Sequence, residues 1–127
     1  MFARAISISV LTIMLASPAL ADGDPVKGEK LFARCKVCHT VGKDEPNRTG
    51  PNLYGLFDRK SGEAPGYKYS KALQEADFQW TEEKVYEWLQ NPKTFLPGNK
   101  MIFAGIKDSQ QRKDLIAYLV KATGKED

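Results

Sequence analysis

Residues 35–39 have the sequence Cys35-Lys36-Val37-Cys38-His39, in which two cysteines three positions apart are followed directly by a histidine. This C-x-x-C-H spacing is typical of covalent attachment of a c-type haem. Residues three and four apart share one face of a helical turn, so both thiols can reach one edge of a porphyrin and bond to its vinyl groups. The motif therefore predicts that Cys35 and Cys38 bind one haem c through thioethers and that His39 ligates its iron.

Other uses of a C-x-x-C pair fit the chain less well. A thioredoxin-like motif lies in a β-α-β context, and no β-rich segment precedes Cys35. Structural zinc needs more ligands than the two cysteines and one histidine of this chain provide. A plain disulfide would leave His39 without a role. A redox or structural disulfide remains the main alternative to haem attachment.

The N-terminal segment has the features of a cleaved signal peptide. Arg4 supplies a positive charge, residues 5–16 form an apolar run, and Ala19-Leu20-Ala21 matches an A-x-A cleavage site. An uncleaved membrane anchor is the alternative, but a spanning helix needs about 20 apolar residues. We therefore expect residues 1–21 to be removed and residues 22–127 to form the functional domain in the periplasm.

The composition fits one ordinary globular domain. The 127 residues are 42% hydrophobic and 28% charged, which argues against a disordered chain or a rod. The formal net charge of +3 is far from the dense Lys/Arg surface of a nucleic-acid-binding protein. We expect no nucleic-acid partner.

Helical patterns alternate with long loops. Asp24, Thr81 and Asp108 are suitable N-caps for three amphipathic segments. Helices are expected from Pro25 to about residue 37, from Thr81 to Asn91, from Asp108 to Gly124 and, more weakly, over residues 70–76. The segments 40–69 and 92–107 are rich in glycine and proline but also contain many large apolar side chains. Apolar loops of this length must surround something buried, and a flat apolar cofactor would satisfy them.

Met101 is the candidate for the second axial ligand of the iron. His39 is the only histidine, and the thioethers consume both cysteines. Once the leader is removed, Met101 is the only methionine, and it follows the turn-forming residues Pro97 and Gly98. A lone methionine is more often core filler, and this alternative remains open. Ligation by histidine and methionine raises the reduction potential, as an electron carrier requires.

Several longer stretches resemble the class I cytochrome c family, specifically its mitochondrial-like soluble bacterial members. The resemblance covers Asp24 to Thr123. The matching stretches are Gly28–Phe32, Cys35–His39, Thr49–Leu53, Gly66–Ser70, Pro97–Ile106 and Asp114–Leu119. The resemblance implies an all-α cytochrome c fold, in which three to five short helices and long loops wrap around one covalently bound haem.

The resemblance also implies roles around the haem. The carbonyl of Pro51 would accept the free ring N–H of His39, which fixes the tautomer of that ligand. Arg59, Tyr69 and Trp80 would bind the haem propionates, whose burial without partners would be costly.

Three positions depart from the family pattern. Trp88 stands where tyrosine is usual, Leu73 where asparagine is usual, and Asn99 where threonine is common. We therefore expect an altered polar network beside Met101.

Elsewhere, the resemblance implies that Gly28 lets the first helix cross the last one.

The function implied is that of an electron-transfer protein, not an enzyme. It would shuttle single electrons in a respiratory chain or a similar route, between membrane redox complexes or dehydrogenases, through the haem edge near Cys38 and Phe103. Lys93, Lys100 and Lys107 form a basic stretch around Met101. We expect a monomer that makes transient peripheral contacts with acidic-faced redox proteins or membrane complexes, such as a cytochrome bc-type complex, an oxidase or a reaction centre.

Two other functions remain open at this point. A haem peroxidase or gas sensor would need Met101 to be detached or mobile. A thiol oxidoreductase would use Cys35 and Cys38 as free thiols and carry no haem.

Overall fold

In the part of the chain that the structure describes, a first and a last helix enclose three further helices in the sequence. The computed structural model describes residues 11–13 and 22–125. Within this part the elements are α1 (Pro25–Phe32), the 3-10 turn η1 (Leu56–Asp58), α2 (Lys71–Glu75), α3 (Glu82–Gln90), α4 (Pro92–Phe95) and α5 (Ser109–Ala122). The described residues contain one isolated bridge, between Lys60 and Gln79, and no strand. The predicted all-α class is confirmed.

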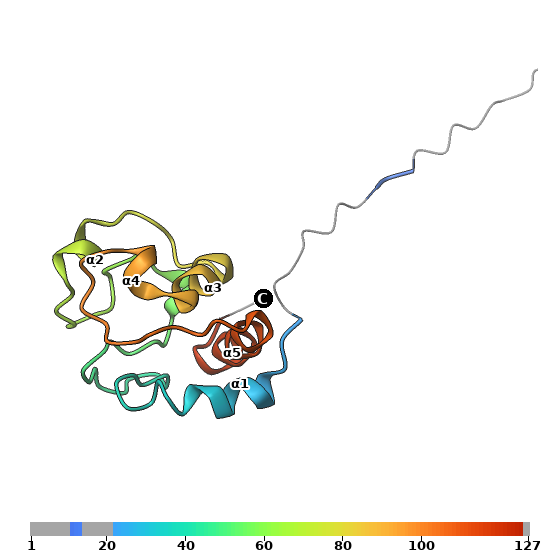
Figure 1. Ribbon diagram of the computed structural model, residues 1–127, viewed down its shortest axis with the longest axis horizontal. Helices are drawn as coiled ribbons and strands as arrows, with labels where there is room; N and C mark the ends of the chain where they lie inside the picture. Colours follow the sequence, from blue (N-terminus) through green and yellow to red (C-terminus); the bar gives the residue numbers. More distant parts are fainter. Residues whose placement is uncertain (1–10, 14–21, 126–127) are drawn as a thin grey trace, which may run out of the picture.

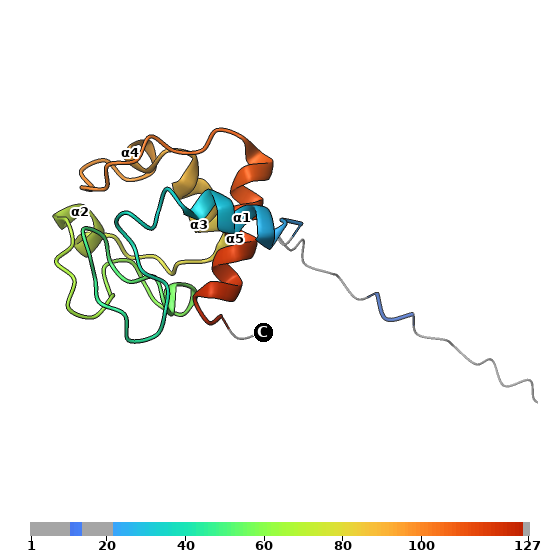
Figure 2. The same cartoon turned by 90° about the horizontal axis from the view of Figure 1, so that it is seen from below.

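The N- and C-terminal helices pack directly against each other. In both views α1 and α5 lie side by side, and α2 lies at the far end of the molecule (Figure 1, Figure 2). A Cβ atom built on Gly28 would overlap the main-chain carbonyl of Asp114, so only glycine allows this close approach. Next to the crossing, the Phe32 and Tyr118 rings lie 5.2 Å apart between centroids. This packing fixes where the chain leaves α1.

Side-chain caps determine where the helices begin. Asp24, Ser70, Thr81 and Asp108 each accept a hydrogen bond from a main-chain N–H two or three residues further on. These bonds satisfy N–H groups that have no partner within the helix. The starts predicted for these four helices are confirmed.

The end of α1 and the segment after α3 differ from expectation. The first helix was expected to continue to about residue 37, but α1 ends at Phe32 and gives way to tighter turns. The segment after Asn91 was expected to be a loop, yet it contains α4. Asn91 caps this helix by accepting from the N–H of Thr94, and Pro92 occupies its first position. The same Asn-Pro pair that stops α3 therefore starts α4.

An aromatic layer joins α3 and α4 to the chain before them. The rings of Phe78, Trp80, Trp88 and Phe95 form a closed set of edge-to-face contacts, with centroids 4.8 to 5.8 Å apart. Edge-to-face packing is a favoured geometry for aromatic pairs. The layer closes one side of the interior and holds α4 against α3.

The predicted leader, residues 1–21, lies outside the described residues apart from residues 11–13. Its cleavage therefore stays a prediction. Among the described helices, none combines the length and the hydropathy needed to span a bilayer.

Candidate haem-binding site

A cavity of about 250 Å³ lies between the two helical ends and the long loops. Most of its walls are apolar side chains, supplied by the chain around residues 49–59 and 67–73, by α3, by residues 100–103 and by α5. Protein interiors are close-packed and rarely leave so large a space among apolar side chains. The cavity therefore fits a large, mainly apolar group.

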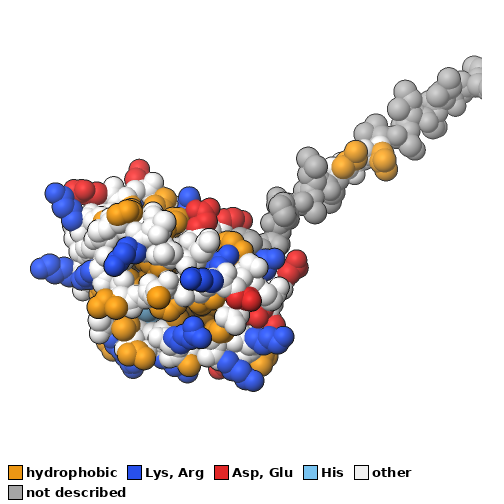
Figure 3. Space-filling model, viewed as in Figure 1, with side chains coloured by type: hydrophobic (Ala, Val, Ile, Leu, Met, Phe, Trp, Pro, Cys, Tyr) orange, Lys and Arg blue, Asp and Glu red, His pale blue; other side chains and the backbone are white. Residues whose placement is uncertain are grey.

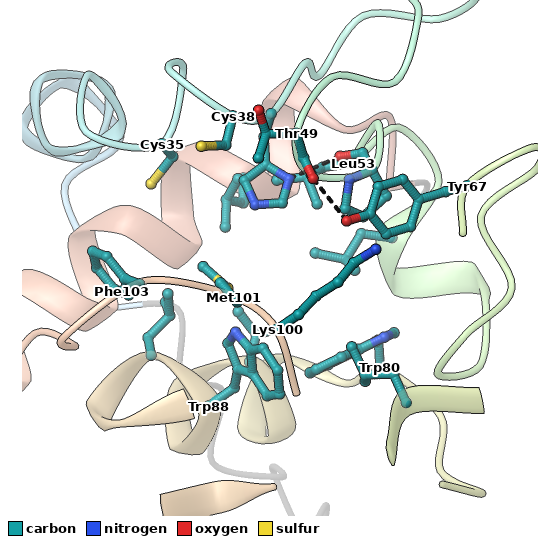
Figure 4. Close-up of a pocket in the computed structure, with 18 of the residues that line it drawn as sticks. Cys35, Cys38, Thr49, Leu53, Tyr67, Trp80, Trp88, Lys100, Met101 and Phe103 are labelled. Atoms are coloured by element: carbon teal, nitrogen blue, oxygen red, sulfur yellow. Dashed lines mark hydrogen bonds between the residues drawn. The ribbon is translucent and has the colours of Figure 1, made fainter. Parts of the chain in front are cut away.

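The C-x-x-C-H segment forms one wall of this cavity. The N–H groups of Cys38 and His39 donate to the carbonyl of Cys35 at 3.0 and 2.8 Å, so a helical turn persists beyond the end of α1. This turn brings both cysteines to the cavity, where they lie half-buried and close to each other (Figure 4). The shared face expected from the spacing is present although α1 itself ends earlier.

His39 is held in one orientation. Its Nδ1 donates to the carbonyl of Pro51 at 2.8 Å, which leaves the lone pair on Nε2 free. The main chain at Gly50 also confines the imidazole ring, because a Cβ on Gly50 would lie 2.5 Å from that ring. Burial lowers the pKa of His39, and the hydrogen bond to Pro51 offsets only part of this effect. The net lowering suits a neutral imidazole, the form that binds metals.

Met101 lies on the facing wall. Its half-buried side chain enters the cavity from the segment before Phe103, across from the two cysteines (Figure 4). The structure thus places the only methionine of the proposed domain opposite Cys35 and Cys38, although about sixty residues of chain separate them.

The three residues expected to bind propionates also line the cavity. Arg59 donates to the carbonyl of Asn52 at 2.8 Å, but its buried Nε has no partner. Tyr69 accepts from the N–H of Ala64 at 3.0 Å and keeps its own hydroxyl proton available. Trp80 is buried at the same cavity. A buried guanidinium nitrogen without a partner fits a carboxylate, so these residues suit an acidic substituent of the bound group.

The departures at Trp88 and Leu73 make the cavity more apolar. Trp88 is buried and packs edge-to-face on Trp80 and Phe95. Leu73 is half-buried in the cavity wall. Asn99 does not line the cavity but hydrogen-bonds to the chain around it.

Two contacts between residues that line the cavity were not expected from the sequence. The Tyr67 hydroxyl donates to the carbonyl of Thr49 at 2.7 Å, and the Lys100 ammonium lies 4.8 Å from the centre of the Tyr67 ring. Lys100 also donates to the carbonyl of Lys68. These partners are far apart in sequence, so no local pattern marks them.

The environment of the Cys35 thiol differs from that of a reactive cysteine. Burial raises the pKa of its thiol to about 11. Reactive cysteines, by contrast, have lowered pKa values.

Comparison with known proteins identifies the family that this geometry belongs to. A family model described as "Cytochrome c" matches residues 25–123. The chain belongs to the cytochrome c family. Members of this family carry a covalently attached haem c with its iron and act as electron carriers, as redox partners of respiratory complexes. The predicted cofactor and fold family are confirmed.

Relatives named "Cytochrome c" match over most of their length. The protein of Chlamydomonas reinhardtii is 53% identical over 102 residues, which are 80% of this chain and 91% of the relative. That of Ginkgo biloba is 48% identical over 105 residues, which are 82% and 93% of the two chains. That of Gibberella zeae is 47% identical over 105 residues, which are 82% and 99%.

The expected periplasmic location is wrong. The relatives are mitochondrial-type cytochromes c from a plant, an alga and a fungus, not bacterial periplasmic proteins with cleaved signal peptides. The physical reason for the error is that an arginine followed by a short apolar run is suited to membrane passage in general. It does not specify which membrane.

Proposed function

We propose that residues 22–127 form a one-haem electron-transfer domain. In it, Cys35 and Cys38 would hold the haem through thioethers, and His39 and Met101 would ligate its iron. The observation that carries this proposal is the cavity itself, with the C-x-x-C-H turn on one wall and Met101 facing it across an apolar space. When bound, the haem iron supplies reversible one-electron oxidation and reduction.

The residues of the chain would keep this redox centre rigid and dry. The Pro51 carbonyl accepts from Nδ1 of the cavity-lining His39 and so leaves Nε2 free as a ligand, and a hydrogen-bonded imidazole is a more basic ligand. The apolar walls exclude water and so strengthen electrostatic contacts inside. With His39 and Met101 both ligating the iron, no site would remain for substrate or oxygen, which favours electron transfer over peroxidase or gas-sensing activity.

Arg59, Tyr69 and Trp80 would hold the propionates of the haem. The Nε of Arg59 and the hydroxyl of Tyr69 each have a proton to donate. Burial lowers the pKa of Arg59, because the guanidinium is poorly solvated there. A nearby carboxylate would compensate that cost.

Electrons would enter and leave at the exposed edge of the cavity. Ile102, beside Met101, is fully exposed, and Lys93 and Lys107 are exposed on the same part of the chain. The face in Figure 3 shows hydrophobic side chains and separate Lys and Arg side chains, with Asp and Glu side chains at its upper and right edges. This surface suits brief docking of a monomer on acidic-faced redox proteins such as a cytochrome bc-type complex, an oxidase or a reaction centre.

Ligand binding tests the proposed coordination. The ferric holoprotein should be low-spin, and the reduced protein should not bind carbon monoxide, whereas Met101→Ala should bind it rapidly. Rapid binding by the unaltered protein would overturn ligation by Met101. Intact mass and thiol titration test the cysteines: a mass without haem and two free thiols would overturn their assignment.

A further inference from the structure

The side chain of Asn99 uses its whole carboxamide to connect α4 to the main chain of Met101. Its Nδ2 donates to the carbonyls of Pro92 and Leu96, both at 2.8 Å. Its Oδ1 accepts from the N–H of Met101 at 3.0 Å. The orientation of the amide follows from these partners, because two carbonyls require the nitrogen and an N–H requires the oxygen.

This connection is important because the following segment has few others. In the described chain, no main-chain group of residues 102–105 takes part in a hydrogen bond. The next main-chain bond is from the N–H of Ile106 to the carbonyl of Leu89, at 2.8 Å. Met101 therefore begins a span that is held at one end by Asn99 and at the other by α3.

Other side chains of similar size cannot make the same three bonds. An aspartate at position 99 could still accept from Met101 but would face the carbonyls of Pro92 and Leu96 without donors. A serine or threonine has one hydroxyl proton and could serve only one of the two carbonyls. The carboxamide is thus matched to this site.

We propose that Asn99 is the positioning residue for Met101: it ties the methionine to α4 and so sets how readily the sulfur leaves the iron. This inference rests on the proposed axial role of Met101. Asn99 does not line the cavity, so it acts through the main chain and not by contact with the haem.

Competition by imidazole tests this role in the ferric holoprotein. The rate of imidazole uptake and the loss of the sulfur-to-iron charge-transfer band report detachment of Met101. Asn99→Asp should speed uptake by about tenfold, because two hydrogen bonds, each contributing a factor of roughly two to ten, are lost. Asn91→Asp is the matched control, since it adds the same charge at the other end of α4 while aspartate still caps that helix.

Each outcome is decisive. Faster uptake in Asn99→Asp but not in Asn91→Asp supports the inference. Uptake equal to that of the unaltered protein, with the charge-transfer band intact, overturns the inference alone. If the unaltered protein lacks the band and takes up imidazole as fast as Met101→Ala, the proposed function falls and this inference with it.

A second variant covers the case in which Asn99→Asp does not fold. Asn99→Ser adds no charge and keeps one donor, so its uptake rate should lie between those of the unaltered protein and Met101→Ala. A rate equal to that of the unaltered protein would overturn the inference.

Discussion

Gly28→Ala should destabilise the protein although alanine is the better helix former. Within α1 the substitution by itself would add about 1 kcal/mol of helix stability. However, the new Cβ would overlap the carbonyl oxygen of Asp114 and lie 2.6 Å from its carbon and 2.8 Å from the Tyr118 Cβ. Carbon atoms pack best at roughly 3.5–4.0 Å, so α1 and α5 would have to move apart.

These contacts determine how much the substitution lowers the free energy of unfolding. Overpacking costs about 1–3 kcal/mol, and the upper end applies because the atoms in the way are mainly main chain of a helix and cannot rotate aside. Separation of the helices would also loosen the packing of Phe32, which is only 1% exposed, against Tyr118. After the gain in helix propensity is subtracted, the free energy of unfolding should fall by about 2 kcal/mol.

Urea unfolding of the oxidised holoprotein, followed by far-UV circular dichroism, measures this change. Lys30→Ala is the control, because Lys30 is exposed on the same helix and its replacement should change stability by less than about 0.5 kcal/mol. If Gly28→Ala unfolded at the same urea concentration as the unaltered protein, or at a higher one, the steric account of the crossing would be refuted.

Two further predictions concern charge. The double variant Lys93→Glu, Lys107→Glu should slow electron transfer to an acidic redox partner, most at low ionic strength. The control Lys121→Glu, near the other end of α5, should not slow it. If the double variant transferred electrons as fast as the unaltered protein at low salt, this docking surface would be contradicted. At the crossing, the N–H of Asp24 donates to Asp114 at 2.8 Å and lowers the pKa of this carboxyl below its ordinary 3.8. The resulting stabilisation is present above about pH 4 and is lost as the pH falls through the lowered folded pKa. In urea titrations, Asp114→Asn should therefore lose less stability between pH 7 and pH 3 than the unaltered protein does, and an equal loss would exclude this linkage.

Features that depend on neighbouring residues could be predicted well from the sequence. The caps at Asp24, Thr81 and Asp108 were predictable, because a cap needs only a short polar side chain and the next few N–H groups. Prediction was weaker where the same residues can either end one helix or begin the next. Asn91-Pro92 predicted the end of α3 but also starts α4, since a stop for one helix has the composition of a start for the next.

The candidate site likewise has one part that follows from local sequence and one part that depends on distant segments. The spacing of Cys35, Cys38 and His39 places three chemical groups on one turn, so their proximity follows from the chain itself. By contrast, nothing in the sequence around Asn99 indicates that its amide bridges α4 and Met101. That role depends on the path of the main chain before and after it.

The spacing of Cys35, Cys38 and His39 was enough to predict the family and its cofactor and to propose the residues on the attachment side, because covalent chemistry and helical spacing act over a few residues. What faces that side depends on how the chain folds. The tertiary structure brings Met101 across the cavity, leaves the Nε of Arg59 without a partner, and ties residue 101 to α4 through Asn99. The physical reason is that these contacts depend on how α1 and α5 cross and on how the loops close over the cavity. Packing between segments that are distant in the sequence sets the crossing and the path of the loops.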